Sequence, residues 1–352
     1  SGRPTLTFGA RGVLALELTV YGPKFALHSG HYGNWVPNPT LRLAQLLGSM
    51  KDDQGRVLVE GFYDGIPPLG DEERRILRAV PDDPAALRKL FGVARFDAVG
   101  ESLQEAIQFP SLNIRGFRSG YVGSDARTII PAEATASVDV RLVKETPSGT
   151  MLEKVLAHIR KQGYHVVAGE PDDATRLQYP KLVRVSRREG DAEAFRTDMT
   201  LPQSRLAARA LEQAWGVEPV RIRTSGGTVP LSPFIQALGF PAIGVPTVNF
   251  DNNQHSENEN LRLGHFWRAI VTMAALLAMP PQAPAAPEAS WLDPDKSEPA
   301  GTRYRTFRST TAGGEVSYLV YLPPDYETAK ERRYPVVYWL HGLGGNQRGG
   351  AT

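Results

Sequence analysis

Two histidines stand in settings that could do chemistry. His28 lies within LHSGHYGNWVPNP, where glycine turns can hold a side chain out from a rigid frame. His255 lies within NFDNNQHSENENLRL, close to Asp251, Glu257 and Glu259. Because an imidazole near carboxylates at the end of a sheet strand suits a metal ion, the second cluster is a candidate metal site. The plainer alternatives are a surface histidine for the first cluster and a helix cap or loop for the second.

Two further segments contain residues that could carry chemistry. Thr128 and Arg141 occur in SGYVGSDARTIIP and VDVRLV, where the plain interpretations are a turn residue and a surface arginine paired with Asp139. In RTSGGTVPL, Gly227 and Thr228 stand between a strand and a helix. Glycines at such a place let backbone N–H groups approach an anion such as a carboxylate, although most such pairs only form tight turns.

The elements around these segments alternate between strands and helices. Residues 13–22 and 134–143 alternate apolar and polar side chains with period two, which predicts half-buried strands. Asn38 and Pro39 begin a predicted helix, and a later helix ends near Gly163 before the strand HVVAG. The apolar stripe of the first helix is predicted to be Leu41, Ala44, Leu47 and Met50. We expect a small α+β sandwich over residues 9–196, with 62–110 as a long connection inside it.

The pattern changes near residue 197. SRLAARALEQAWG predicts a helix that Ser204 caps and Gly216 closes. PVRIRT and FPAIGVPTV are expected as short buried strands, and LGHFWRAIVTMAALLAM as a final helix, so 197–279 fits a parallel or mixed sheet covered by helices. Residues 280–299 are rich in Pro and Ala and predict a linker, after which 300–352 begins with a hairpin and a buried strand.

Composition excludes several classes of partner. With 40 basic and 38 acidic side chains the net charge is +2, which gives no electrostatic case for nucleic acid or a membrane surface. No run approaches the roughly 18 apolar residues that span a bilayer. The absence of cysteine excludes disulfides and thiolate ligands, so any metal must bind His, Asp or Glu. The compartment stays open between the cytoplasm and a secreted or periplasmic location in a bacterium.

The order of the motifs resembles a known family. An RG-strand is followed by LHSGHYGNWVPNP, GFYDGI, SLNIRGFRSGYVG, TIIP, VDVRLV, SGGTVPL and QHSENENLRL. Over about residues 3–278 this series is similar to carnosinase-like zinc peptidases, which also include glutamate carboxypeptidase and succinyl-diaminopimelate desuccinylase. The resemblance implies an α/β and α+β protein, in which residues 1–8 and 197–279 are parts of a catalytic sheet. Residues 9–196 would be an inserted lid domain that forms a homodimer.

The resemblance also implies roles for the candidate residues. His28 matches a lid histidine that reaches across the dimer to stabilise the oxyanion on the partner's substrate, and Thr128 matches another contact to that site. Arg141 matches the arginine that holds the substrate carboxylate. Gly227 and Thr228 match a loop that also receives this carboxylate, and His255 matches the last ligand of a two-zinc site.

The sequence departs from the family in ways that bear on activity. The chain begins without a start Met in what resembles the middle of a domain, and the family's His-x-Asp motif, bridging aspartate and Glu-Glu pair are not found. Thr224 and Ser225 stand where carnosinase-like sequences often have Arg and Glu, which bears on the substrate. The expected parent is a metallo-dipeptidase or carboxypeptidase acting on small peptides or N-acyl amino acids with two zinc ions. The chain as given is expected to be inactive.

The C-terminal residues resemble a different enzyme. VYLPPDYETAKERRYPVVYWLHGLGGNQRGG is similar to the start of an esterase D or feruloyl-esterase type α/β-hydrolase, in which the loop at His341, Gly342, Leu343 and Gly344 would supply oxyanion-hole N–H groups. An inert turn is the alternative, because no nucleophile elbow follows. Two rival functions for the whole chain are a non-catalytic dimerisation module and part of a bifunctional peptidase-esterase.

Overall fold

The computed structural model describes residues 2–249, 251–279, 292, 296–309, 314–329 and 331–332. The chain divides into two compact units, Ser1–Met279 and Pro280–Thr352. No helix in the described part of the chain has both the length and the apolar composition to cross a membrane.

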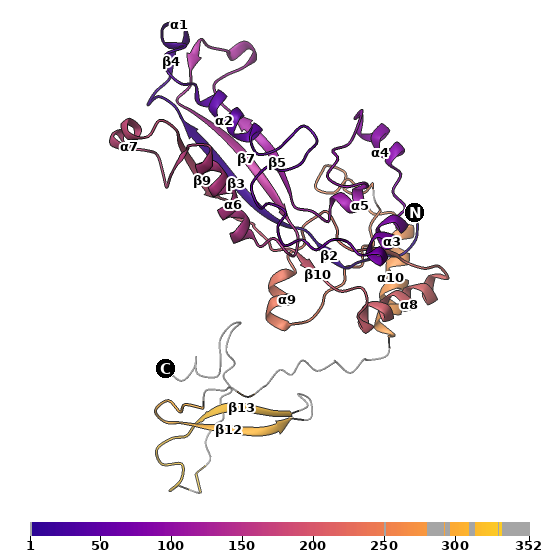
Figure 1. The fold of residues 1–352 in the computed structure, drawn as a ribbon. Helices are drawn as coiled ribbons and strands as arrows, with labels where there is room; N and C mark the ends of the chain where they lie inside the picture. The colour runs from indigo at the N-terminus through magenta and orange to yellow at the C-terminus, as the bar shows by residue number, and fades with distance from the viewer. Residues whose placement is uncertain are drawn as a thin grey trace. The chain divides into compact units, whose positions relative to one another are not determined.

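A five-stranded sheet forms the centre of the first unit (Figure 1). Its order is β5 (Ser111–Arg118), β7 (Glu133–Leu142), β3 (Gly12–Tyr21), β9 (Leu182–Arg187) and β8 (His165–Val167). The antiparallel pair β3–β7 runs over its full length, from Gly12 opposite Leu142 to Tyr21 opposite Glu133. The strands predicted at 13–22 and 134–143 and in HVVAG are therefore confirmed, within a residue or two at each end.

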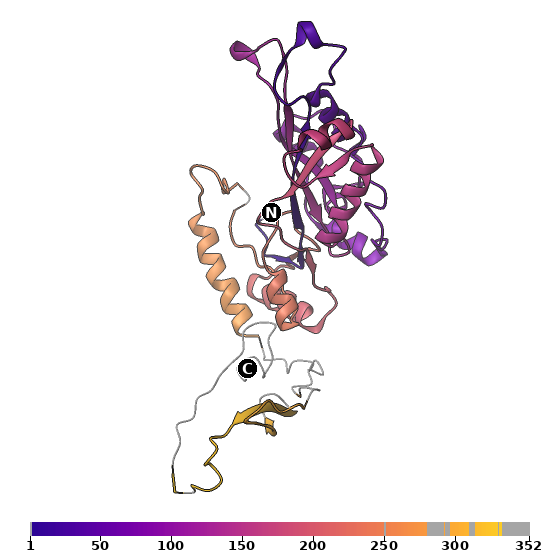
Figure 2. The ribbon, with the colours of Figure 1, turned by 90° about the vertical axis from the view of Figure 1, so that its left-hand side faces the viewer.

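Two helices, α2 (Pro39–Gly48) and α6 (Ser148–Lys161), cover one face of this sheet (Figure 2). Fully buried side chains from both layers, among them Leu16, Leu43 and Met151, form one apolar core. The sheet face, α2 and α6 together make the predicted α+β sandwich.

The predicted apolar stripe of α2 was half right, because Leu47 and Met50 are buried whereas Leu41 and Ala44 are not. Asn38 caps the helix as expected, with its side chain accepting from the Thr40 N–H at 2.8 Å. Pro39 is itself buried at the first turn, which turns the helix so that Leu41 is 59% exposed. Ala44 is also exposed. The buried residues of this segment are Pro39, Leu43, Leu46, Leu47 and Met50.

The segment predicted as a long connection contains three helices. They are α3 (Asp71–Ala79), α4 (Pro84–Phe91) and α5 (Leu103–Ala106). Asp83 caps α4 through its side chain, Pro84 opens the helix, and Gly92 ends it in a left-handed conformation with φ 67°. These local signals are present in the sequence.

Beyond the Tyr21 end of the sheet the chain forms a small tip. The short strands β4 (Leu27–His28) and β6 (Ile129–Ile130) pair antiparallel there. They are accompanied by α1 (Ser29–Tyr32) and a single 3-10 turn, η1 (Gly123–Asp125). The helix α7 (Asp173–Gln178) precedes β9.

At the opposite end a narrow crossing joins the sandwich to the rest of the unit. Strand β2 (Gly9–Ala10) pairs antiparallel with β10 (Phe195–Arg196), and β1 (Thr5–Thr7) pairs parallel with β11 (Val220–Ile222). Glycine is needed at two places here. A Cβ on Gly9 would lie 2.7 Å from the Phe195 oxygen, and one on Gly12 would clash with the backbone of Ala192.

The helices α8 (Pro202–Trp215), α9 (Ser232–Leu238) and α10 (Leu263–Leu277) belong to this end of the unit. Gly216 closes α8 as predicted, with φ 67°, but Ser204 lies inside the helix and is not its cap. Its hydroxyl donates to the Asp198 carbonyl at 2.7 Å, because the helix begins earlier, at Pro202. FPAIGVPTV forms an isolated bridge between Gly244 and Thr7 and no regular strand.

The described part of the second unit contains the predicted hairpin. Strands β12 (Thr302–Ser309) and β13 (Gly314–Tyr321) pair antiparallel along their full length. The predicted buried strand, the loop with Gly342 and Leu343, and most of the predicted linker lie outside the described residues.

Candidate functional site

His28 and Thr128 lie side by side at the tip. The Ser29 N–H donates to the Thr128 carbonyl at 3.0 Å, and His28 pairs with Ile129 in the β4–β6 ladder. The exposed His28 ring accepts a hydrogen bond at Nδ1 from the Gly30 N–H, 3.1 Å away. A neutral ring that accepts at Nδ1 carries its proton on Nε2, so the outer nitrogen of His28 is a hydrogen-bond donor.

Arg141 and Thr228 meet at the other end of the sheet. Arg141 Nη1 donates to Thr228 Oγ1 at 3.0 Å, joining residues 87 positions apart. The loop of Thr228 is held against the crossing by backbone bonds, from Ser225 N to the Gly9 oxygen at 2.8 Å and from Arg11 N to the Ser225 oxygen at 3.1 Å. Two of the predicted carboxylate-binding segments are thus neighbours in space.

Asp139 holds Arg141 from within the protein. Arg141 Nε donates to Asp139 Oδ2 at 3.0 Å, and Asn113 Nδ2 donates to Oδ1 at 3.0 Å. Asp139 is only 4% exposed, so the predicted pair exists but is not a simple surface ion pair. Its partners cover it because Asn113 stands directly opposite Asp139 in the β5–β7 register.

Arg11, which sequence reasoning had not singled out, adds a buried cation beside the half-buried Arg141. Burial, together with the positive charge of Arg141, lowers the pKa of Arg11 to about 10, and Asp139 partly offsets this. Arg11 Nη2 donates to the Phe109 carbonyl at 2.9 Å and to Ser111 Oγ at 2.7 Å. In the sequence, Arg11 could have been noticed as the arginine of the RG pair at the start of β3.

The two clusters are separated by the length of β7. A ten-residue strand spans about 30 Å, whereas an extended dipeptide spans about 7 Å. Within one chain, His28 and Arg141 therefore cannot touch the same small substrate.

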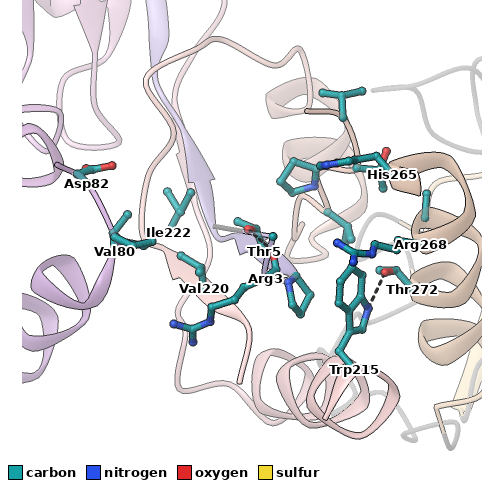
Figure 3. Close-up of a pocket in the computed structure, with 18 of the residues that line it drawn as sticks. Arg3, Thr5, Val80, Asp82, Trp215, Val220, Ile222, His265, Arg268 and Thr272 are labelled. Carbon is teal, nitrogen blue, oxygen red and sulfur yellow. Dashed lines mark hydrogen bonds between the residues drawn. The ribbon is translucent and has the colours of Figure 1, made fainter. Parts of the chain in front are cut away.

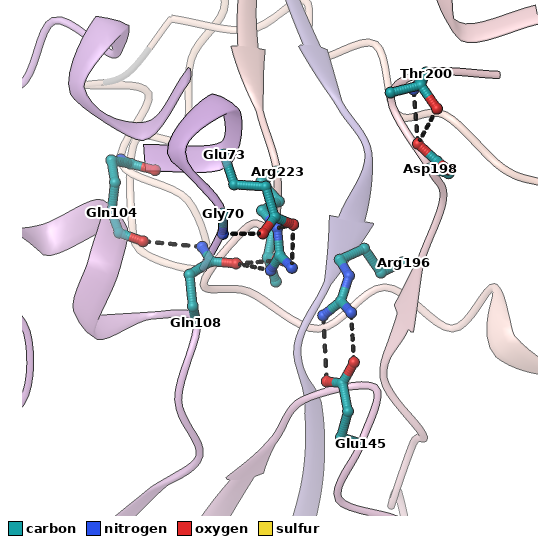
Figure 4. Close-up of polar contacts among 10 residues, drawn as sticks. Gly70, Glu73, Gln104, Gln108, Glu145, Arg196, Asp198, Thr200 and Arg223 are labelled. Atoms are coloured by element: carbon teal, nitrogen blue, oxygen red, sulfur yellow. Dashed lines mark hydrogen bonds and ion pairs between the residues drawn. The ribbon is translucent and has the colours of Figure 1, made fainter. Parts of the chain in front are cut away.

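A buried polar network lies beside the crossing (Figure 4). Arg223, 5% exposed, donates to Glu73 Oε1 at 2.7 Å and to Gln108 Oε1 at 2.6 Å. The Thr224 hydroxyl donates to the same Gln108 oxygen at 3.1 Å. Burial acts to raise the pKa of Glu73, but hydrogen bonds from the Gly70 N–H and Arg223 hold it below its ordinary value. The network fastens α3 to the end of β11.

A second ion pair in the same view joins Arg196 of β10 to Glu145, which follows β7 (Figure 4). Arg196 donates from both terminal nitrogens to the two carboxylate oxygens of Glu145. Burial acts to raise the pKa of Glu145, yet Arg196 keeps it below its ordinary value.

A cavity of about 810 Å³ lies between α10, the β1–β11 pair and the α3–α4 segment (Figure 3). Trp215 Nε1 donates to Thr272 Oγ1 at 3.0 Å within it, and Arg268 stacks over the Trp215 ring with its guanidinium carbon 5.3 Å from the centroid. None of the residues predicted to act on substrate lines this cavity.

Comparison with known proteins matches two parts of the chain to families. Residues 8–167 match the peptidase dimerisation domain, and residues 309–352 match the putative esterase family. The Cys-Gly metallodipeptidase DUG1 of Saccharomyces cerevisiae is 29% identical over 278 residues, covering 78% of this chain and 55% of the relative. The human beta-Ala-His dipeptidase is 28% identical over 276 residues, covering 78% and 52%.

This chain is homologous to the M20 metallodipeptidases. Solved structures agree. An M20 family metallo-carboxypeptidase from Sulfolobus solfataricus is 29% identical with a TM-score of 0.67 over 79% of this chain and 60% of that one. Dug1p from Saccharomyces cerevisiae is 26% identical with a TM-score of 0.64 over 79% and 56%. This chain spans about half the length of the curated relatives it matches.

The relatives' names imply a metal, for which His255 is the predicted ligand in this chain. His255 is exposed in a loop with φ 63°, and nearby Asp251 is ion-paired with Arg262. The described residues contain no group of three or more His, Cys, Asp or Glu side chains that could hold a metal ion. His255 with its sequence neighbours does not make the self-contained metal site considered above, and no catalytic step can be built on it.

Proposed function

We propose that this chain is the carboxylate-binding and dimer-forming part of a metallopeptidase that cleaves dipeptides or small peptides. The observation that carries the proposal is the contact between Arg141 and Thr228 at 3.0 Å. It joins two segments of this chain, those of Arg141 and Thr228, to which the family resemblance separately assigned the binding of one substrate carboxylate. The names of the relatives, which include Cys-Gly and beta-Ala-His dipeptidases, support substrates of this size.

The chemistry of the pair suits a peptide C-terminus. Thr228 Oγ1 accepts from Arg141, so its own proton remains to be donated to an incoming oxygen. Arg141 supplies a charge-assisted fork that matches the two oxygens of a carboxylate. Gly227 is exposed and has no side chain to block the loop's backbone.

We further propose that His28 and Thr128 serve the active site of a second copy. The length of β7 keeps them from the carboxylate pair of their own chain. The donor on His28 Nε2 suits the negative charge that develops on a carbonyl oxygen during amide hydrolysis. A symmetric homodimer gives each tip a partner site to reach.

The surface of the sheet supports dimerisation through β5. This strand stands at one edge of the sheet, and its residues from Asn113 onward are exposed. Ile114 and Phe117 on it are large apolar side chains that are nearly half exposed. An exposed edge with apolar side chains is suited to pairing with another chain.

Zinc enters the proposal through the relatives' chemistry. His255 is proposed as one ligand of a two-zinc site, because it matches the family's last ligand. The described residues supply no complete ligand set around it, so we propose that this chain alone is inactive towards dipeptides. Zinc, when bound in a complete peptidase, would supply an activated water.

The test is calorimetric binding of a dipeptide and of its C-terminal amide to the full chain. The dipeptide should bind saturably and the amide should not. Arg141→Ala should weaken dipeptide binding about ten- to a hundredfold, because it removes a charge-assisted pair. Arg115→Ala, on exposed β5, is the matched control and should bind normally. Equal binding of the amide would refute the carboxylate site, and zinc-dependent hydrolysis by this chain would refute its inactivity.

A second candidate function, a bifunctional peptidase-esterase, has one observation in its favour. Residues 309–352 match the putative esterase family. The proposed oxyanion loop, with Gly342 and Leu343, lies outside the described residues. Hydrolysis of a p-nitrophenyl ester by the chain would favour this candidate, and its failure would leave the hairpin as a structural appendage.

A further inference from the structure

The outer face of β7 carries one buried acid among half-buried polar residues. Along the strand, Ala134, Ala136, Val138, Val140 and Leu142 point into the core. Thr135, Ser137 and Arg141 on the opposite face are half-buried, whereas Asp139 between them is buried. A carboxylate out of water needs hydrogen-bonding or charged partners, so the arrangement around Asp139 is a structural requirement.

The two oxygens of Asp139 are divided between two partners. Oδ2 accepts from Arg141 Nε and Oδ1 accepts from Asn113 Nδ2, each at 3.0 Å. With Nε engaged by Asp139 and Nη1 by Thr228, Nη2 of Arg141 makes no hydrogen bond to any described residue. One N–H of Nη1 and both of Nη2 remain, and the end-on edge of the guanidinium consists of one N–H from each of these nitrogens.

We propose that Asp139 and Asn113 are positioning residues, which turn the Nη1–Nη2 edge of Arg141 toward the substrate carboxylate. The inference rests on the proposed carboxylate site. If Nε were free, the guanidinium could offer either its Nε–Nη2 edge or its end-on edge. The bond to Asp139 leaves only the end-on edge, beside the Thr228 hydroxyl.

The local charge favours a ligand with a single negative charge. Arg11 and Arg141 contribute two positive charges, and Asp139 contributes one negative charge, which leaves one positive charge. One carboxylate neutralises that remainder. A neutral amide would leave it unpaired in a partly desolvated site, which costs free energy.

Asn113 extends this positioning to the edge of the sheet. It belongs to β5, whose register with β7 shifts between Ile114 and Gly116, one residue pair beyond Asn113–Asp139. A protein or second copy that pairs with β5 would contact the strand that carries Asn113, the residue that holds Asp139. The binding of a carboxylate by Arg141 would therefore depend on whether β5 is paired with another chain.

Arginine-specific modification of the full chain by phenylglyoxal tests the inference. Peptide mapping by mass spectrometry gives a separate rate for each arginine. Asn113→Ala should speed modification of Arg141 about fivefold or more, because Asp139 loses the partner that fixes it. The rate at Arg118, at the far end of the same strand, should not change. Arg115→Ala is the matched control, since it removes a β5 bond to Ser137 and leaves Asp139 untouched.

The outcomes separate this inference from the proposed function. An unchanged Arg141 rate in Asn113→Ala, or an equal rise at Arg118, would overturn the positioning role. Asp139→Asn gives a second variant, with the Arg141 rate expected to rise while circular dichroism stays that of the parent. Protection of Arg141 by a dipeptide tests the carboxylate site itself. Faster modification in Asn113→Ala without dipeptide protection would support positioning and refute the proposed ligand.

Discussion

The Ser49 hydroxyl oxygen lies 2.9 Å from His158 Nε2 and joins the end of α2 to the last turn of α6. Ser49 gives its own proton to the Leu46 carbonyl at 2.7 Å, so it accepts from the His158 ring. Burial, and secondarily the charge of Lys161, lowers the pKa of His158. The two helices that cover the sheet thus meet at a titratable residue whose neutral form the folded state favours.

This contact predicts a pH dependence of stability. Because the folded state disfavours the protonated ring, His158 contributes fully above its ordinary value of 6.5, and the contribution falls as pH drops below it. Urea unfolding between about pH 8 and about pH 5.5 should show declining stability in the parent. His158→Gln should flatten that decline, whereas His31→Gln, at the exposed tip, should not. An unchanged slope in His158→Gln would refute the assignment.

The Glu73–Arg223 pair predicts a second effect at lower pH. Glu73→Gln should reduce the free energy of unfolding by about 1–3 kcal/mol near neutral pH, because buried Arg223 loses its charged partner. The folded-state pKa of Glu73 is depressed, so its stabilisation is present above 4.5 and is lost as pH falls further. The difference between parent and variant should therefore shrink in acid. Glu72→Gln, which breaks only an exposed pair with Arg75, is the neighbouring control.

The phase of α2 can be checked with two leucines on the same helix. Leu43→Ala should cost about 2–5 kcal/mol in the free energy of unfolding, since Leu43 is completely buried. Leu41→Ala should change it by less than about 0.5 kcal/mol. Denaturant-induced unfolding of both variants gives the two free energies. A comparable loss of unfolding free energy in both would mean that Leu41 also faces the core.

Dimerisation through the sheet edge predicts a charge-sensitive surface. Ile114→Lys places a cation on β5 at a side chain that is 45% exposed, and should shift sedimentation towards the monomer. Leu177→Lys, at a side chain on α7 that is 90% exposed, should leave the assembly state unchanged. A parent chain that sediments only as a monomer at high concentration would refute the proposed homodimer.

Local signals predicted the sandwich, the Asn38 cap of α2 and the Gly216 end of α8, but they misplaced part of the α2 stripe and the start of α8. The alternation in β3 and β7 and the Asn38–Pro39 helix start depend on neighbours in sequence, so they were visible there. Burial of Pro39 involves its close approach to Gly22, which follows β3 and is distant from α2 in sequence, so no periodicity within the helix predicts it. The starts of α3 and α4 were present as acidic and Asp-Pro signals, yet a Pro-, Asp- and Arg-rich composition obscured them.

The candidate site was only partly visible in the sequence for a similar reason. Asp139 and Arg141 share a strand face at a spacing of two, so their pairing was predictable. The contact with Thr228 joins two distant segments, and the loop of Thr228 is held at the crossing by backbone bonds between Ser225 and both Gly9 and Arg11. Sequence spacing alone carries no information about such a junction.

The crossing of β2 and β10 also gives the chain a mechanical asymmetry. Arg141 lies near this pivot, whereas His28 lies beyond the far end of β3, a strand of ten residues and about 30 Å. A bend of about 10° at the pivot would carry the His28 tip through about 5 Å over that lever arm and hardly displace Arg141. For the same bend, the end proposed to bind the carboxylate would therefore stay almost in place, whereas the end proposed to reach a partner would undergo the largest displacement.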